Sequence, residues 1–80
     1  MRDRNKKLHA LFFEGGASMN RLREVRVVKR ITQFQLRLST GIHQGKISLI
    51  ENGLMQPRDD EKKRLSKALG VTPQDLFPSD

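Results

Sequence analysis

The chain has 80 residues and no cysteine, which allows one small domain and excludes both a disulfide scaffold and a thiolate metal site. No apolar run approaches the ~20 residues that a membrane-spanning helix requires, and the apolar stretch near the N-terminus is too short for a signal peptide. The formal net charge of +7 favours a polyanionic partner, because binding phosphates releases condensed counterions. We expect a cytoplasmic protein with no metal, no cofactor and no membrane partner.

Residues 1–18 differ in composition from the rest of the chain, and we interpret them as an N-terminal arm before a domain over residues 19–80. The arm begins with charged residues and ends in a Gly-Gly-Ala-Ser linker. Between them, Leu8, Leu11 and Phe12 have the i, i+3, i+4 spacing of one face of a short helix, which needs a partner surface to be stable. The alternative is a mobile tail.

The first helix of the domain is predicted over residues 20–31, where basic side chains form a solvated face. Its core-facing positions are Leu22, Val25 and Ile31. Val27 and Val28 lie off this apolar stripe, so they are predicted to be exposed. An exposed valine pair favours a cover, which either the arm or a second subunit would supply.

A pair of short helices is predicted from Thr32 onward. Thr32 and Gln35, three residues later, have the spacing of a capping box. The apolar positions of the helix that follows are Leu36 and Leu38. Gly41 can adopt a positive φ angle without steric cost, so it ends this helix and permits a sharp turn.

The second helix of the pair is predicted from about Gln44 to Asn52. Ile42 fills the space between the two helices, and Ile47 and Ile50 form the buried face of the second one. The other faces carry Gln44, Gly45, Lys46, Ser48 and Leu49. Because a short helix with small polar residues on its outer side fits the major groove of DNA, we interpret the pair as a helix-turn-helix.

A fourth helix is predicted after a loop that contains Pro57. Asp59 or Asp60 is expected to cap it, since acidic residues suit the positive end of a helix. Its buried positions are Leu65, Ala68 and Leu69. Gly70 is expected to close the helix.

The last helix is predicted to be short. Thr72 caps it, Pro73 occupies its first position and Asp75 stands three residues after the cap. Leu76 and Phe77 return to the core. The predicted fold class is therefore all-α, with five short helices, no strands and no internal repeat.

The chain resembles the Cro/repressor-type helix-turn-helix family, also called XRE-type or lambda-repressor-like. The resemblance spans roughly Met19 to Phe77. It rests on Thr32-Gln33, Leu36, Gly41-Ile42, Ile47-Ser48, Ile50-Glu51-Asn52-Gly53, Pro57, Ala68-Leu69-Gly70-Val71 and Asp75-Leu76-Phe77. Two positions depart from the family pattern: Arg37 stands where a small residue is usual, and His43 stands where Ser or Thr caps the second helix.

The resemblance implies a role for each matched position. It places the second helix of the motif in the major groove and pairs Arg26 with Glu51 in a structural salt bridge. The implied base-contacting residues are Gln44, Gly45, Ser48 and Leu49. The implied phosphate-contacting residues are Thr32, Gln33, His43, Asn52 and Arg58, and the charge of Lys46 also favours a phosphate.

Among these residues, Gln44 is the best candidate for direct readout, because its amide can form a bidentate pair with adenine. Two alternatives remain open. The Gln44 side chain can simply face solvent, and Leu49 can be partly buried against Leu54 rather than contact a thymine methyl group.

Two functions from different classes fit the sequence. The first is a sequence-specific transcriptional regulator, a repressor that binds a pseudo-palindromic operator as a homodimer. The second is an antitoxin-like protein-interaction module, in which the arm binds a protein partner and DNA binding is secondary. The sequence does not indicate an enzyme, since it has no nucleophile set, no paired carboxylates in an apolar setting and no glycine-rich phosphate loop.

Overall fold

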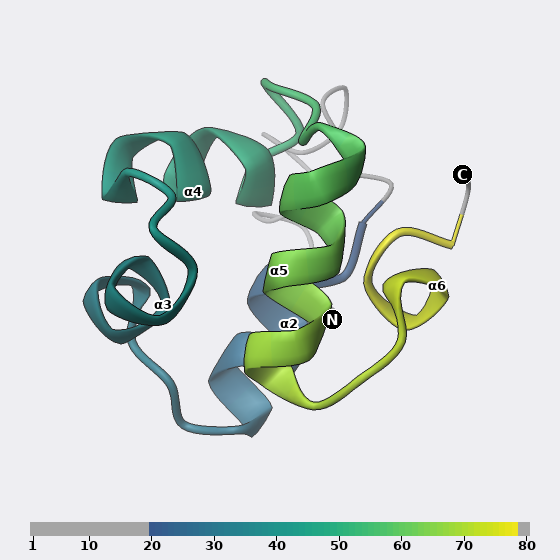
Figure 1. Ribbon diagram of the computed structural model, residues 1–80, viewed down its shortest axis with the longest axis horizontal. Coiled ribbons are helices and arrows are strands. Elements are labelled where there is room, and N and C mark those ends of the chain that lie inside the picture. The colour runs from purple at the N-terminus through teal and green to yellow at the C-terminus, as the bar shows by residue number, and fades with distance from the viewer. Residues whose placement is uncertain (1–19, 79–80) are drawn as a thin grey trace, which may run out of the picture.

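The computed structural model describes residues 20–78, which form five α-helices and no strand. The helices are α2 (Leu22–Val28), α3 (Gln33–Thr40), α4 (Gln44–Glu51), α5 (Asp59–Leu69) and α6 (Pro73–Leu76) (Figure 1). The all-α prediction is confirmed for this part of the chain, and the arm predicted over residues 1–18 lies outside it. No described helix is long and apolar enough to cross a membrane.

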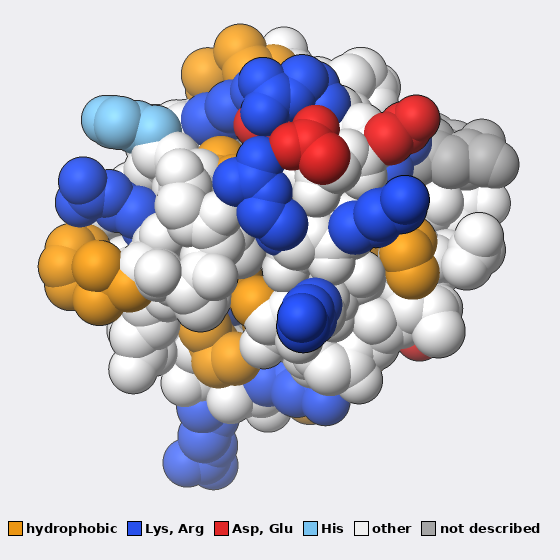
Figure 2. All heavy atoms as spheres, in the orientation of Figure 1, with side chains coloured by type: hydrophobic (Ala, Val, Ile, Leu, Met, Phe, Trp, Pro, Cys, Tyr) orange, Lys and Arg blue, Asp and Glu red, His pale blue; other side chains and the backbone are white. Residues whose placement is uncertain are grey.

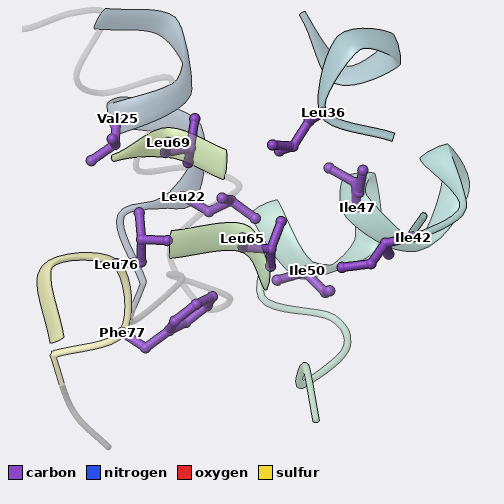
Figure 3. Packing of buried hydrophobic residues seen from close by; sticks show 10 residues of the cluster. All are labelled: Leu22, Val25, Leu36, Ile42, Ile47, Ile50, Leu65, Leu69, Leu76 and Phe77. Atoms are coloured by element: carbon purple, nitrogen blue, oxygen red, sulfur yellow. The ribbon is translucent and has the colours of Figure 1, made fainter. Parts of the chain in front are cut away.

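One cluster of buried apolar side chains joins all five helices (Figure 3). It comprises Leu22, Val25, Leu36, Ile42, Ile47, Ile50, Leu65, Leu69, Leu76 and Phe77. In Figure 1, α5 lies centrally, with α3 and α4 on one side and α6 on the other. Because Ile47 and Ile50 are buried, α4 is held against the core by one face, as the sequence predicts, and Ile42 in the turn before it is buried as well.

The helix termini confirm most of the predicted caps. Thr32 and Gln35 form a complete capping box at the start of α3, and Thr72 and Asp75 form another at the start of α6. Gly41 ends α3 with a φ angle of 78°. Gly70 likewise has a left-handed backbone after α5. These capping residues and glycines therefore fix where the helices before and after α4 begin or end.

The first helix is shorter than predicted, because α2 ends at Val28 and not near Ile31. Arg30 adopts a left-handed backbone with a φ angle of 59°. The Ile31 N–H then donates to the Arg26 carbonyl at 3.0 Å, and the Arg30 N–H donates to the Val27 carbonyl at 2.9 Å. These two bonds form a Schellman motif, which usually has glycine where Arg30 stands. Ile31 still packs against the core from outside the helix.

Two further predictions are wrong. Leu38 does not share the buried face of α3, since it is 67% exposed while Leu36 is fully buried. The reason is that residues two apart lie on different sides of a helix. The cap of α5 is Arg58 rather than Asp59 or Asp60. There the Glu61 carboxylate accepts the Arg58 backbone N–H at 2.9 Å, so an acidic side chain supplies the cap from inside the helix.

Candidate nucleic-acid interface

The outward side of α4 gathers the four predicted base-contacting residues. Successive residues in an α-helix are rotated by about 100°, so Gln44, Ser48, Gly45 and Leu49 span an arc of about 140°. The fully buried Ile47 and Ile50 lie on the opposite side. The helix therefore presents one continuous exposed strip.

These four residues differ in what they offer to a ligand. Gln44 is exposed, and its amide forms no hydrogen bond among the described residues. Gly45 is exposed and carries no side chain. Ser48 is partly buried, and Leu49 is 38% exposed. Gln44 is thus the side chain in the strip with the largest unused hydrogen-bonding capacity.

The imidazole of His43 caps the start of α4. Its Nδ1 accepts the backbone N–H of Gly45 at 3.1 Å. The ring takes the place of the hydroxyl that is usual at this position, and a neutral His43 with Nδ1 as acceptor carries its proton on Nε2. Since His43 is exposed, that N–H remains available to an anion.

At its other end, α4 is anchored by a buried carboxylate. The Glu51 side chain is fully buried, and the structure pairs it with Arg26 at 2.5 Å. Gln33 donates to the same carboxylate at 3.0 Å, and Arg23 approaches it at 3.4 Å. The Arg26 guanidinium also donates to the Ile31 carbonyl, at 2.9 Å. This cluster ties α2 and α3 to the last residue of α4.

Asn52 and Thr32, both expected to contact phosphate, are already engaged within the protein. The Asn52 amide donates to the Ser48 carbonyl at 2.9 Å and accepts from Arg23 at 3.2 Å. The Thr32 hydroxyl accepts the Gln35 backbone N–H at 3.0 Å. The Asn52 amide thus keeps one N–H for an external anion, and the Thr32 hydroxyl, which acts here as an acceptor, keeps its O–H donor. The first N–H groups of α3 also have no partner within the helix.

A second buried carboxylate, Glu61, lies near the first turn of α4. It receives the Lys46 ammonium at 2.8 Å, the Arg58 backbone N–H at 2.9 Å and the Arg58 guanidinium at 3.6 Å. Burial alone would raise the pKa of Glu61, but these hydrogen bonds and charges outweigh it and hold the pKa below the ordinary value. The carboxylate is therefore charged at neutral pH.

The family assignment follows from a comparison with known proteins. The model of the Cro/C1-type HTH DNA-binding domain matches residues 21–78. The chain belongs to the Cro/C1-type helix-turn-helix DNA-binding family. No curated protein and no solved structure matches the chain. The resemblance stated from the sequence is thus confirmed, and the match spans all five described helices of this Cro/C1-type domain.

The Cro/C1-type domain also contains contacts beside the turn that the sequence analysis did not predict. Arg64 donates to the Thr40 carbonyl at 2.9 Å and to Asp60 at 2.5 Å, so α5 contacts the end of α3 beside the turn. Asp60 in turn binds Arg58, and the hydrogen bonds from Arg58 and Arg64 lower the pKa of Asp60. Spacing within α5 indicates the Asp60–Arg64 pair, but no sequence signal indicates the contact with Thr40.

Among the charged side chains on the face of the Cro/C1-type domain shown in Figure 2, basic ones prevail over acidic ones. Lys and Arg side chains gather over α5 and its N-terminal end, with acidic side chains among them at the upper edge of the view. Arg58 belongs to this end of α5 and has a side chain that is 63% exposed. Its ion pairs with Asp60 and Glu61 orient the guanidinium without burying it.

Proposed function

We propose that this Cro/C1-type protein is a sequence-specific transcriptional repressor that places α4 in the major groove of DNA. The observation that carries the proposal is the exposed strip of α4, which offers Gln44 and Ser48 while Ile47 and Ile50 fix the opposite face. Phosphate contacts supply affinity, and side chains at base edges supply sequence preference. A protein bound across a promoter excludes polymerase, which is the basis of repression.

The dimensions of α4 support this placement. Eight residues make a helix about 12 Å long, which is close to the width of the major groove. His43 caps the first turn of α4, and Arg58 pairs with Glu61, the same carboxylate that binds Lys46 of that turn. Gln33 and Asn52 lie at the last turn of α4. Donors at both ends of the helix suit phosphates on both edges of one groove.

Within the groove, we propose that Gln44 forms the bidentate pair with adenine. Ser48 hydrogen-bonds a base edge with little discrimination, and Leu49 contacts a thymine methyl group. Gly45 contributes no hydrogen bond, and its small size lets the backbone approach the bases closely. One helix then specifies only a few base pairs.

The phosphate contacts are proposed for side chains and N–H groups at the ends of α3 and α4. The N-terminus of α3 offers the backbone N–H and side-chain amide of Gln33 and the hydroxyl of Thr32 to one phosphate, since the Thr32 backbone N–H already donates to Gln35. His43 donates from Nε2, and Arg58 supplies an exposed guanidinium. Asn52 adds a contact on the opposite edge. These contacts set the register of α4 and carry no sequence information directly.

We further propose that the protein binds as a homodimer on a pseudo-palindromic operator. Two copies double the number of base pairs that are read, and their half-sites should lie one helical turn apart, about 34 Å. Large apolar side chains remain exposed on the described domain, with Val28 at 74% and Leu54 at 71%. A second copy would cover part of this surface.

The proposal is tested by selecting duplexes from a random-sequence pool with the full-length chain. The selected duplexes should share a two-fold symmetric sequence with half-sites spaced by one turn, and the bound species should contain two chains. Placed upstream of a reporter gene, that sequence should lower expression when the protein is present. Selection of no common sequence would contradict the proposal.

The exposed apolar residues also favour a second candidate function, a protein-interaction module of antitoxin type. In this case the arm over residues 1–18 and exposed residues such as Val27 and Val28 would bind a protein partner. The two functions differ in their DNA binding. The second predicts salt-sensitive binding without sequence preference, both for the full-length chain and for a chain that lacks residues 1–18.

A further inference from the structure

The residues of α4 that lie outside its buried face are Gln44, Gly45, Lys46, Ser48 and Leu49. Among them, Lys46 is the one whose side chain forms an ion pair within the protein. Its ammonium lies 2.8 Å from Oε2 of Glu61, and its side chain is only 28% exposed. Glu61 belongs to the first turn of α5 and is 5% exposed at the side chain. The pair therefore links the first half of α4 to the start of α5 through a largely desolvated contact.

The direction of Lys46 around α4 also separates it from the exposed strip. At about 100° per residue, the strip from Gln44 to Leu49 is centred about 70° from Gln44, whereas Lys46 lies at about 200°. This places Lys46 about 130° from the centre of the strip and beside the buried Ile50. A groove that receives the strip would therefore face away from the Lys46 side chain.

Moving the ammonium to a phosphate would be unfavourable for a further reason. Glu61 would then keep only the Arg58 backbone N–H and the more distant Arg58 guanidinium. A buried carboxylate that loses one of its partners is strongly destabilised, because burial removes the water that would replace the partner. The protein and the DNA thus compete for Lys46, and the protein already provides the closer counter-charge.

We propose that Lys46 is a positioning residue that holds α4 against α5 through Glu61 and does not bind phosphate in the DNA complex. This inference rests on the proposed function and reassigns one residue of the predicted phosphate-contacting set. Its counterpart at the other end of α4 is the buried Glu51 with Arg26. Two buried carboxylates, one from α5 and one from α4 itself, therefore fix the two ends of the recognition helix.

The test exchanges the ion pair for a neutral hydrogen-bonded pair in the double variant K46Q/E61Q. The amide introduced at position 61 still accepts the Arg58 backbone N–H, and the amide introduced at position 46 can still hydrogen-bond to it. Binding is measured to a random-sequence duplex and to a selected duplex over a range of salt concentrations. K46Q/E61Q leaves the net charge unchanged. Arg58→Ala shows the effect of a lost phosphate contact, and Lys63→Met, which removes an exposed lysine of α5, controls for the positive charge that Arg58→Ala loses.

The salt slope is the steepness with which the logarithm of the binding constant falls as the logarithm of the salt concentration rises. The inference predicts that K46Q/E61Q keeps the wild-type salt slope on the random-sequence duplex and keeps the preference for the selected duplex. A slope lower by about one, as Arg58→Ala should give, would identify Lys46 as a phosphate ligand and overturn the inference.

The outcome for the wild-type chain separates this inference from the proposed function. If the wild-type chain binds no duplex, both the proposed function and the inference are contradicted. If the wild-type chain prefers the selected duplex and only the slope of K46Q/E61Q changes, the inference alone fails.

Discussion

The side-chain amide of Gln33 donates a 3.0 Å hydrogen bond to Oε1 of Glu51, which joins the first residue of α3 to the last residue of α4. The same carboxylate is fully buried and paired with Arg26 of α2. One charge therefore fixes the relative positions of three helices. The second N–H of the Gln33 amide remains available, so the residue can hold Glu51 and still bind a phosphate.

Replacing Arg26 with Met should destabilise the fold by roughly 3–5 kcal/mol, because Glu51 stays buried with only weaker partners. The midpoint of urea unfolding, followed by far-ultraviolet circular dichroism, measures the loss. Arg21→Met is the matched control, since it removes an exposed arginine from the ion pair with Glu24 and should leave the midpoint nearly unchanged. Equal effects of the two variants would show that the Arg26–Glu51 pair is not the anchor.

Arg58→Ala should weaken binding to every DNA sequence and reduce the salt slope by roughly one. In the proposed complex the substitution removes one exposed cation from a phosphate, while the backbone N–H at position 58 can still donate to Glu61. Fluorescence anisotropy with a random-sequence duplex at several salt concentrations measures the slope. Lys63→Ala serves as the control for net charge. A preserved slope would remove Arg58 from the phosphate contacts.

Stability should fall in acid, because three carboxyl groups within residues 20–78 have lowered pKa values in the folded state. Burial opposes the shift at Glu61, but hydrogen bonds from Arg58 and Lys46 lower its pKa. Hydrogen bonds from Arg58 and Arg64 lower the pKa of Asp60, and those from the Thr72 backbone and hydroxyl lower that of Asp75.

The sign follows from proton linkage. In the unfolded chain these carboxyl groups bind protons near pH 4, whereas in the folded chain they bind protons only at lower pH. Protonation therefore favours the unfolded state. Thermal unfolding should give a constant Tm from about pH 7 down to about pH 5 and a falling Tm below about pH 4. Asp75→Asn keeps the acceptor for the Thr72 N–H but removes one titrating group, so its acid dependence should be shallower. A Tm that is unchanged at low pH would contradict the assignment.

Two substitutions at left-handed positions should have opposite effects on stability. Gly41→Ala should cost about 1–2 kcal/mol, because its φ of 78° strains any residue with a Cβ atom. An added Cβ would lie 3.7 Å from the Arg64 guanidinium, so strain and not collision is the cause. Arg30→Gly should stabilise by a similar amount, about 1 kcal/mol, since Arg30 has a φ of 59°. Urea unfolding measures both, and a stabilising Gly41→Ala would contradict the turn geometry.

Short-range signals explain why most of the fold was predictable. The capping boxes at Thr32 and Thr72 depend on residues three positions apart, and Gly41 and Gly70 supply left-handed backbone directly. The end of α2 was not predictable in this way, because Arg30 occupies a position where glycine is usual. Its conformation is compatible with the chain only because Ile31 packs against the core and the turn is closed by backbone hydrogen bonds.

The contacts around the candidate site were harder to predict, because they join residues far apart in the sequence. The sequence analysis paired Arg26 with Glu51 only through the family resemblance. In the structure, Nε of Arg26 lies 2.5 Å from Oε2 of Glu51. The Lys46–Glu61 pair has no local pattern, since the two residues belong to different helices. Exposure of Gln44 could be predicted from helix periodicity, whereas the engagement of Asn52 with Ser48 and Arg23 could not.

The central claim is that Gln44 reads an adenine from the major groove, and a double-mutant cycle tests it most directly. The selected duplex is compared with one that carries N7-deaza-adenine at the same position, for the wild-type chain and for Gln44→Ala. We predict that loss of N7 weakens wild-type binding by part of the ~1–3 kcal/mol of discrimination and leaves Gln44→Ala unaffected. If N7-deaza-adenine at every adenine of the half-site leaves wild-type binding unchanged, or weakens both chains equally, Gln44 does not read adenine in the major groove.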